Sequence, residues 1–85
     1  MIKHFKPEYL IRKLKLPGRS IEDRLVYQEY DYELREIVFE NLDGKYYKTR
    51  YIKTRDSISL RQKGNRVICF EVIPEKITIT HWREI

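Results

Sequence analysis

The segment Asn41-Leu42-Asp43-Gly44 constrains the fold of this 85-residue chain more than any other feature. It has the pattern of a type I turn that closes with a glycine in the left-handed conformation, and it separates two stretches of alternating residues. This turn predicts a β-hairpin in which Asn41 is opposite Lys45. We expect its strands to span 31–41 and 45–55.

The residues that this register places opposite each other are complementary. Two pairs are apolar and three join opposite charges, whereas a two-residue turn would set Asp31 against Asp56 and form none of these charge pairs. Since one cross-strand pair contributes only about 0.2–1 kcal/mol, agreement among several pairs is the stronger evidence. The predicted pairs are Phe39–Tyr47, Leu34–Ile52, Glu36–Arg50, Glu33–Lys53 and Asp31–Arg55.

Composition favours strands along most of the chain. The sequence has no alanine, the best helix former, but eleven isoleucines and seven tyrosines. We expect a single small domain, 1–85, in which 30–82 forms a twisted antiparallel meander of four to six strands. The apolar run 66–73 is expected as its central strand and 77–82 as its last strand. The predicted core is Ile37, Phe39, Ile58, Leu60, Ile68, Phe70, Val72, Ile77 and Ile79.

The N-terminal segment, 1–19, has a different pattern. Leu10, Ile11 and Leu14 follow Pro7 at helical spacing, which predicts a short helix over 7–16 that ends at Pro17-Gly18. In 20–29 two interpretations stay open, because a capping pattern begins at Ser20 while the residues from Leu25 suit a strand. The predicted fold class is therefore α+β, with one or two short N-terminal helices packed on the meander.

Several kinds of chemistry lack support in the sequence. No stretch approaches the roughly 20 apolar residues of a membrane helix, and the single cysteine, Cys69, excludes an internal disulfide. We therefore expect an intracellular, cytoplasmic protein without membrane contact. Ligands for a zinc site and a glycine-rich phosphate loop are both lacking. We predict no metal, no cofactor, no small-molecule substrate and a buried, inert Cys69.

Charge is distributed in blocks along the chain. Residues 20–43 hold two basic and eight acidic residues, a net charge of −6, and residues 44–66 hold eight basic residues and one acidic, a net charge of +7. The hairpin register brings these two blocks together, so we expect them to cancel largely. Residues 1–19 carry six basic groups against Glu8, and their net charge of +5 equals that of the whole chain.

These patterns predict a non-catalytic module that binds RNA or DNA without sequence specificity, through phosphate contacts. An ordinary solvated surface is the alternative for the N-terminal segment, and an ion-pair ladder for much of the 44–66 block. The predicted contact residues are Lys3, Lys6, Arg12, Lys13, Lys15, Arg19, Lys45, Lys48, Arg61, Lys63, Arg66 and Tyr46.

Two other functions remain open. The chain is also typical of a small accessory or inhibitor protein that binds another protein through edge strands and aromatic contacts at Tyr46, Tyr51 and Trp82. A metal-independent ribonuclease is a weaker hypothesis, because it requires His4 to lie beside His81 on the last strand. An exposed last strand is also compatible with a homodimer.

Overall fold

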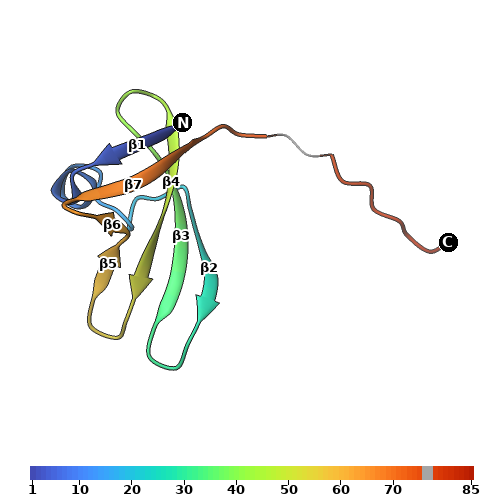
Figure 1. Cartoon of the computed structure of the whole chain (residues 1–85). Helices are drawn as coiled ribbons and strands as arrows, with labels where there is room; N and C mark the ends of the chain where they lie inside the picture. The colour runs from blue at the N-terminus through green and yellow to red at the C-terminus, as the bar shows by residue number, and fades with distance from the viewer. Residues whose placement is uncertain (76–77) are drawn as a thin grey trace.

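The computed structural model describes residues 1–75 and 78–85, and the strands in this part of the chain form one antiparallel sheet (Figure 1). The strand order is β1-β7-β4-β3-β2, with β5 paired to β4 and β6 paired to β7. One short helical segment, η1, follows β1. The elements are β1 Ile2–Phe5, η1 Tyr9–Lys13, β2 Glu22–Gln28, β3 Glu33–Glu40, β4 Tyr46–Lys53, β5 Ile58–Leu60, β6 Gln62–Lys63 and β7 Arg66–Val72.

The predicted register of the central hairpin is confirmed. Glu33 is opposite Lys53, Glu36 opposite Arg50 and Phe39 opposite Tyr47. The Asn41 N–H donates to the Lys45 carbonyl at 2.9 Å, and the Gly44 N–H donates to the Asn41 carbonyl at 3.0 Å. Gly44 has φ 81°, the left-handed value that the turn requires of its glycine. The ladder ends at Glu33, so the predicted pair of Asp31 with Arg55 lies beyond it.

The predicted α+β class is wrong, because the structure is mostly antiparallel sheet and has almost no helix. Of the helix expected over 7–16, only 7–13 is helical, and η1 accounts for the last five of these residues. The chain reverses at Lys15, which has φ 59°, and the Leu16 N–H donates to the Leu10 carbonyl at 3.0 Å. This reversal brings the Leu16 side chain into the core, where a continued helix would not place it.

Residues 20–29 form a strand rather than a second helix. β2 extends the hairpin on the outer edge of β3, beginning with the Ile21 N–H, which donates to the Val38 carbonyl at 2.7 Å. The register shifts between Leu25 and Tyr27, which is a β-bulge. A strand is favoured here because β3 offers a row of backbone partners that an isolated helical turn lacks.

A strand at the N-terminus was not expected, and it changes the topology. β1 pairs with β7, Ile2 opposite Phe70 and Phe5 opposite Val67. β7 in turn pairs with β4 through residues 70–72. The sheet is therefore not a simple meander, since its first and last strands are neighbours. The segment between β1 and β2 crosses the sheet and carries η1 with it.

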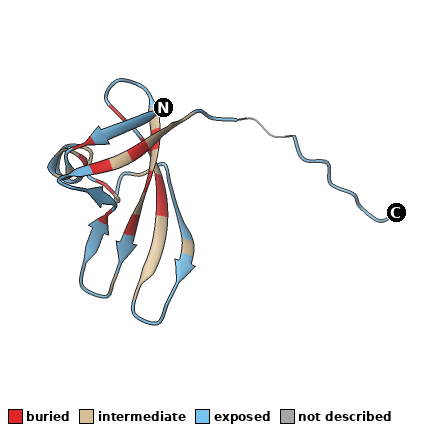
Figure 2. Cartoon of the chain, viewed as in Figure 1, coloured by how far each residue is buried: buried red, intermediate tan, exposed pale blue. Residues whose placement is uncertain are grey.

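Buried residues concentrate on β3, β4 and β7 (Figure 2), and their alternation along these strands places the apolar ones on one side of the sheet. The Phe5 ring is at the centre of this core, with ring centroids 5.3 Å from Tyr47 and 6.0 Å from Phe39. Leu10 of η1 is fully buried and covers the same side. The buried apolar residues are Phe5, Leu10, Leu16, Ile37, Phe39, Tyr47, Tyr51, Leu60, Val67 and Cys69.

The core prediction was correct for β3 and for Leu60, and wrong for β7. Val67 and Cys69 have no exposed surface, whereas the predicted Ile68, Phe70 and Val72 are only half-buried. The run is apolar on both faces, so alternation alone does not define which face packs inward. Two further predictions fail, since Ile58 is 49 % exposed and Ile79 is 68 % exposed, and Ile77 lies outside the described residues.

The last predicted strand, 77–82, is absent in its described part. Residues 78–85 belong to no strand and lead away from the sheet (Figure 1). Trp82 is 93 % exposed. Within 1–75 and 78–85, none of the helical structure is long and apolar enough to cross a membrane.

Candidate nucleic-acid interface

The side of the sheet opposite the core, which we call the open face, carries aromatic and basic residues together. A row of paired residues crosses β1, β7, β4, β3 and β2, from Ile2 through Phe70, Lys48 and Val38 to Glu22. Residues opposite each other in an antiparallel ladder share a face, so these side chains lie on one side. The one helical segment of the described chain packs on the core side through Leu10. The open face is therefore accessible to a ligand.

Three basic side chains surround one depression of the open face, which we call the cationic hollow. It has a volume of about 300 Å³ and is lined by Lys48 and Arg50 of β4, by Arg61 between β5 and β6, and by Phe70 of β7. β4 supplies two of the cations because residues 48 and 50 point the same way along a strand. The Arg61 N–H donates to the Arg50 carbonyl at 2.9 Å, which holds the third cation beside them.

Glu36 forms the acidic wall of the cationic hollow and is only 8 % exposed. Its carboxylate accepts hydrogen bonds from Arg24 at 2.7 Å and from Arg50 at 3.1 Å. Burial by itself raises the pKa of Glu36, but the two guanidinium groups outweigh it and hold that pKa below its ordinary value. Glu36 is therefore ionised at neutral pH and fixes the position of Arg50.

Lys48 and Arg61 keep their positive charge available for a ligand. Among the residues that the structure describes, neither has a carboxylate oxygen within 4.0 Å of its side-chain nitrogens. Arg50 is partly neutralised by Glu36, and Phe70 presents a half-buried ring beside them. Two free cations beside an aromatic ring can bind a phosphate and stack an unpaired base.

The predicted contact residues divide into three groups. Tyr46, Lys48 and Arg61 lie on or beside the open face. Lys3 is engaged elsewhere, since its Nζ lies 3.4 Å from an Asp43 carboxylate oxygen and over the rings of Phe5 and Tyr47. The other predicted residues are exposed and lie outside the cationic hollow: Lys6, Arg12, Lys13, Lys15, Arg19, Lys45, Lys63 and Arg66.

Five of these cations belong to elements that meet at one end of the sheet, which we call the basic end. Phe5 is opposite Val67, so the chain leaves β1 next to the start of β7, where Lys63 is opposite Arg66. η1 stays near this end because the Tyr9 ring stacks on Phe5 with centroids 5.7 Å apart. Lys45 lies at the β3–β4 turn, which η1 also reaches, because the Tyr9 hydroxyl donates to the Asn41 side-chain oxygen. The basic end comprises Lys6, Arg12, Lys13, Lys63 and Arg66.

The expected cancellation between the two central blocks is only partial. Of the three predicted charge pairs, only Glu36 with Arg50 forms an ion pair. Glu33 is opposite Lys53 but pairs with Arg35, which also binds Asp23 at 2.8 Å. Asp23 and Glu33 therefore form ion pairs with an arginine of their own block, residues 20–43. This leaves more free positive charge in 44–66 than the sequence suggested.

Phe70 and Arg50 are contact candidates that the sequence did not single out. Phe70 was assigned to the core because the run around it is continuously apolar. The two faces become distinguishable once Val67 is known to be opposite the buried Phe5, whereas Phe70 is opposite the exposed Ile2. The sequence alone did not show that the N-terminal residues pair with this run.

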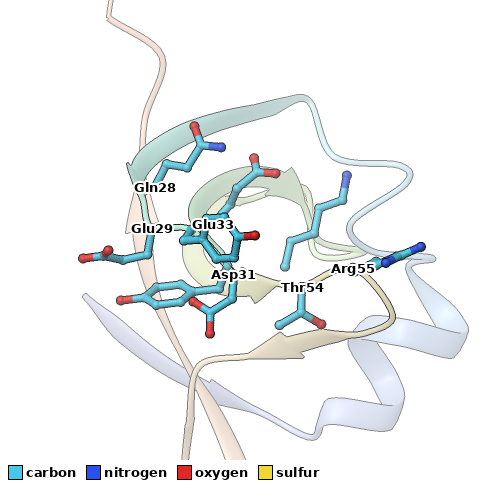
Figure 3. Close-up of a pocket in the computed structure, with 9 residues that line it drawn as sticks. Gln28, Glu29, Asp31, Glu33, Thr54 and Arg55 are labelled. Carbon is cyan, nitrogen blue, oxygen red and sulfur yellow. The ribbon is translucent and has the colours of Figure 1, made fainter.

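A larger hollow of about 610 Å³ lies between the β2–β3 turn and the β4–β5 turn (Figure 3). Its charges are mixed, with Glu29, Asp31 and Glu33 against Lys53 and Arg55. Figure 3 shows Glu29 and Arg55 pointing away from each other on opposite sides. Its side chains therefore do not converge on a common point as in a catalytic site.

The remaining reactive side chains are separated. Cys69 is buried, and burial raises the pKa of its thiol to about 11, so the reactive thiolate is scarce at neutral pH. His4 is exposed on β1, and His81 is exposed in 78–85, where no strand forms. The arrangement required by the two-histidine ribonuclease scheme is not present. In residues 1–75 and 78–85, three or more His, Cys, Asp or Glu side chains nowhere form a metal-binding group.

Comparisons of the chain with protein-family models, with curated proteins and with solved structures give no match.

Proposed function

We propose that the chain binds single-stranded nucleic acid, RNA or DNA, on its open face and without sequence specificity. The observation that supports this proposal is the cationic hollow. Lys48 and Arg61 line it beside Phe70 and form no ion pair within the described residues. The lysine and the arginine contact backbone phosphates. The Phe70 ring stacks on a base, and Tyr46 on the same face offers a second ring.

A single strand fits this surface better than a duplex. Stacking on an aromatic side chain requires an unpaired base whose π face is accessible, and every base offers such a face. A hollow of about 300 Å³ that is open to one side accepts one base at a time. Contacts of this kind distinguish poorly between sequences, which is consistent with binding that lacks specificity.

The basic end extends the positive surface away from the cationic hollow. Arg61 leads directly into β6, and Lys63 of β6 is opposite Arg66. A strand that leaves the hollow past Arg61 therefore meets further cations. Their attraction is not directional, and it accelerates association and adds to affinity mainly at low salt.

The proposal is tested by titrating the protein into labelled oligonucleotides of about twelve nucleotides, a length within the usual site size. Thymidine and uridine oligomers compare DNA with RNA. Lys48→Ala and Arg61→Ala should each weaken binding about tenfold, because each removes a charged phosphate contact.

Lys53→Ala is the matched control. It removes the same charge from the same strand, at an exposed position outside the cationic hollow. It should change the affinity by less than about twofold, as expected for a distant charge screened by salt. Equal losses in all three variants, or no binding at low salt, would overturn the proposal.

A further inference from the structure

Residues 78–85 have the composition of a β-strand but no strand partner in the structure. Thr78, Ile79 and Thr80 are β-branched, the residue class that favours strands most. No backbone hydrogen bond joins 78–85 to the rest of the described chain, and Ile79 and Trp82 are exposed. We call 78–85 the free segment. A sequence of this kind is usually found paired in a sheet.

The sheet has an open edge of suitable length. Within residues 1–75 and 78–85, β2 pairs only with β3, so its outer edge carries unpaired backbone N–H and C=O groups. Leu25 and Tyr27 on this strand are 45 % and 50 % exposed. Long, exposed edge strands of this kind readily accept another strand.

Apolar surface continues beyond the start of this edge. A hollow of about 440 Å³ is lined by Ile21 before β2, by Val38 of β3, and by Val72 and Ile73 at the end of β7. Ile21 is 56 % exposed and Ile73 is 80 % exposed. Of these residues, Ile21 lies at the start of the β2 edge, where an added strand would shield it from water.

We propose that the free segment of one chain adds as a strand to β2 of a second copy, and that the second copy does the same in return. Each chain carries both the donor strand and the acceptor edge. A two-fold arrangement therefore forms the same contact twice, which is the usual symmetry of a homodimer.

The direction of the chain favours a second copy over the chain's own β2. The free segment leads away from the sheet (Figure 1). After Pro74, the sequence to residue 85 contains no further glycine, proline, asparagine or aspartate, the residues that favour a reversal. Strand addition between copies requires no such reversal. It also leaves the cationic hollow uncovered, because the hollow lies on β4 and β7 rather than at the β2 edge.

The first test is the mass of the full chain in solution by sedimentation equilibrium, from low to high micromolar concentration. We expect a dimer. Ile79→Pro should weaken dimerisation about 100-fold, because proline lacks the N–H that a strand ladder needs. Ile79→Val keeps a β-branched residue and is the matched control, which should dimerise normally.

Folding is monitored in parallel by far-ultraviolet circular dichroism. Position 79 lies outside the sheet and the core, so the spectrum of the Ile79→Pro variant should show the same sheet. A full chain that stays monomeric, or a proline variant that dimerises as tightly as the unmodified chain, would overturn the proposal.

The second test identifies the edge. Leu25→Cys and Ile79→Cys are combined in the same polypeptide, and the purified protein is oxidised. The native Cys69 does not compete because it is buried. A covalent dimer of the double variant on a non-reducing gel, with none in either single-cysteine variant, supports the proposal. A disulfide within one chain, or the absence of a disulfide in a dimeric sample, would contradict pairing with β2 of a second copy.

Discussion

Arg50 and Glu36 face each other across β3 and β4, with the Arg50 Nε 3.1 Å from a Glu36 carboxylate oxygen. The other oxygen of this carboxylate accepts a hydrogen bond from Arg24. The pair combines two functions of the sheet. It joins the two strands of the central hairpin, and it orients one wall of the cationic hollow.

Glu36→Gln should destabilise the fold by about 1–3 kcal/mol, because it weakens two charged hydrogen bonds at a buried site. Since the folded pKa of Glu36 is lowered, the stability from its ionised form is present above its unfolded pKa and is lost as the pH falls through the folded value. Urea unfolding at pH 7 and at about pH 3 measures the difference. The difference in the free energy of unfolding between the unmodified protein and the variant should be smaller at the acidic pH.

Glu40→Gln is the control for this change, because Glu40 is exposed on the same strand and forms no ion pair in the described residues. It should change the free energy of unfolding by less than about 0.5 kcal/mol. If Glu36→Gln lowers the free energy of unfolding equally at both pH values, the ionised carboxylate does not contribute to stability.

Tyr51→Phe should remove a loss of stability that the unmodified protein undergoes at alkaline pH. The Tyr51 hydroxyl donates to an Asp23 carboxylate oxygen at 2.6 Å, and burial together with this bond raises the pKa of Tyr51 to about 12. A raised folded pKa means that the stabilisation is complete below the unfolded value of about 10 and is lost as the pH rises toward 12.

The variant should therefore be less stable than the unmodified protein by about 0.5–1.5 kcal/mol at pH 8, the usual contribution of one hydrogen bond. The difference should decline above about pH 10. Urea unfolding at these pH values measures it, and absorbance at alkaline pH follows the ionisation. An unchanged difference across this range would contradict the assigned role of Tyr51.

Leu10→Ala and Ile11→Ala form a matched pair on η1. Leu10 has no exposed surface, whereas its neighbour Ile11 is 50 % exposed. Leu10→Ala should lower the free energy of unfolding by about 2–5 kcal/mol because it leaves a cavity. Ile11→Ala should lower it by less than about 1 kcal/mol. Thermal or urea unfolding measures both. Similar costs would mean that η1 does not pack on the sheet through Leu10.

The central hairpin could be predicted from the sequence because its information is local. The Asn41–Gly44 turn defines the register, and the charge pattern provides an independent check. The buried Ile37 and Phe39 follow from the same alternation. No distant part of the chain is needed to determine them.

The rest of the fold depends on contacts between distant segments. β1 forms because β7 offers it an edge, and that pairing determines which side of β7 faces inward. Val67 becomes core and Phe70 becomes surface for this reason. Similarly, η1 is cut short because Leu16 is needed in the core. The candidate site was therefore predicted in part, with Tyr46, Lys48 and Arg61 named beforehand and Phe70 missed.

The salt dependence of oligonucleotide binding tests the proposed function most directly. Each phosphate contact contributes about 0.7 to the slope of log affinity against log salt concentration for a single strand. The account predicts a steep negative slope for the unmodified protein and a slope smaller by about 1.4 for the Lys48→Ala, Arg61→Ala double variant. A flat profile for the unmodified protein, or parallel lines for the two proteins, would contradict it.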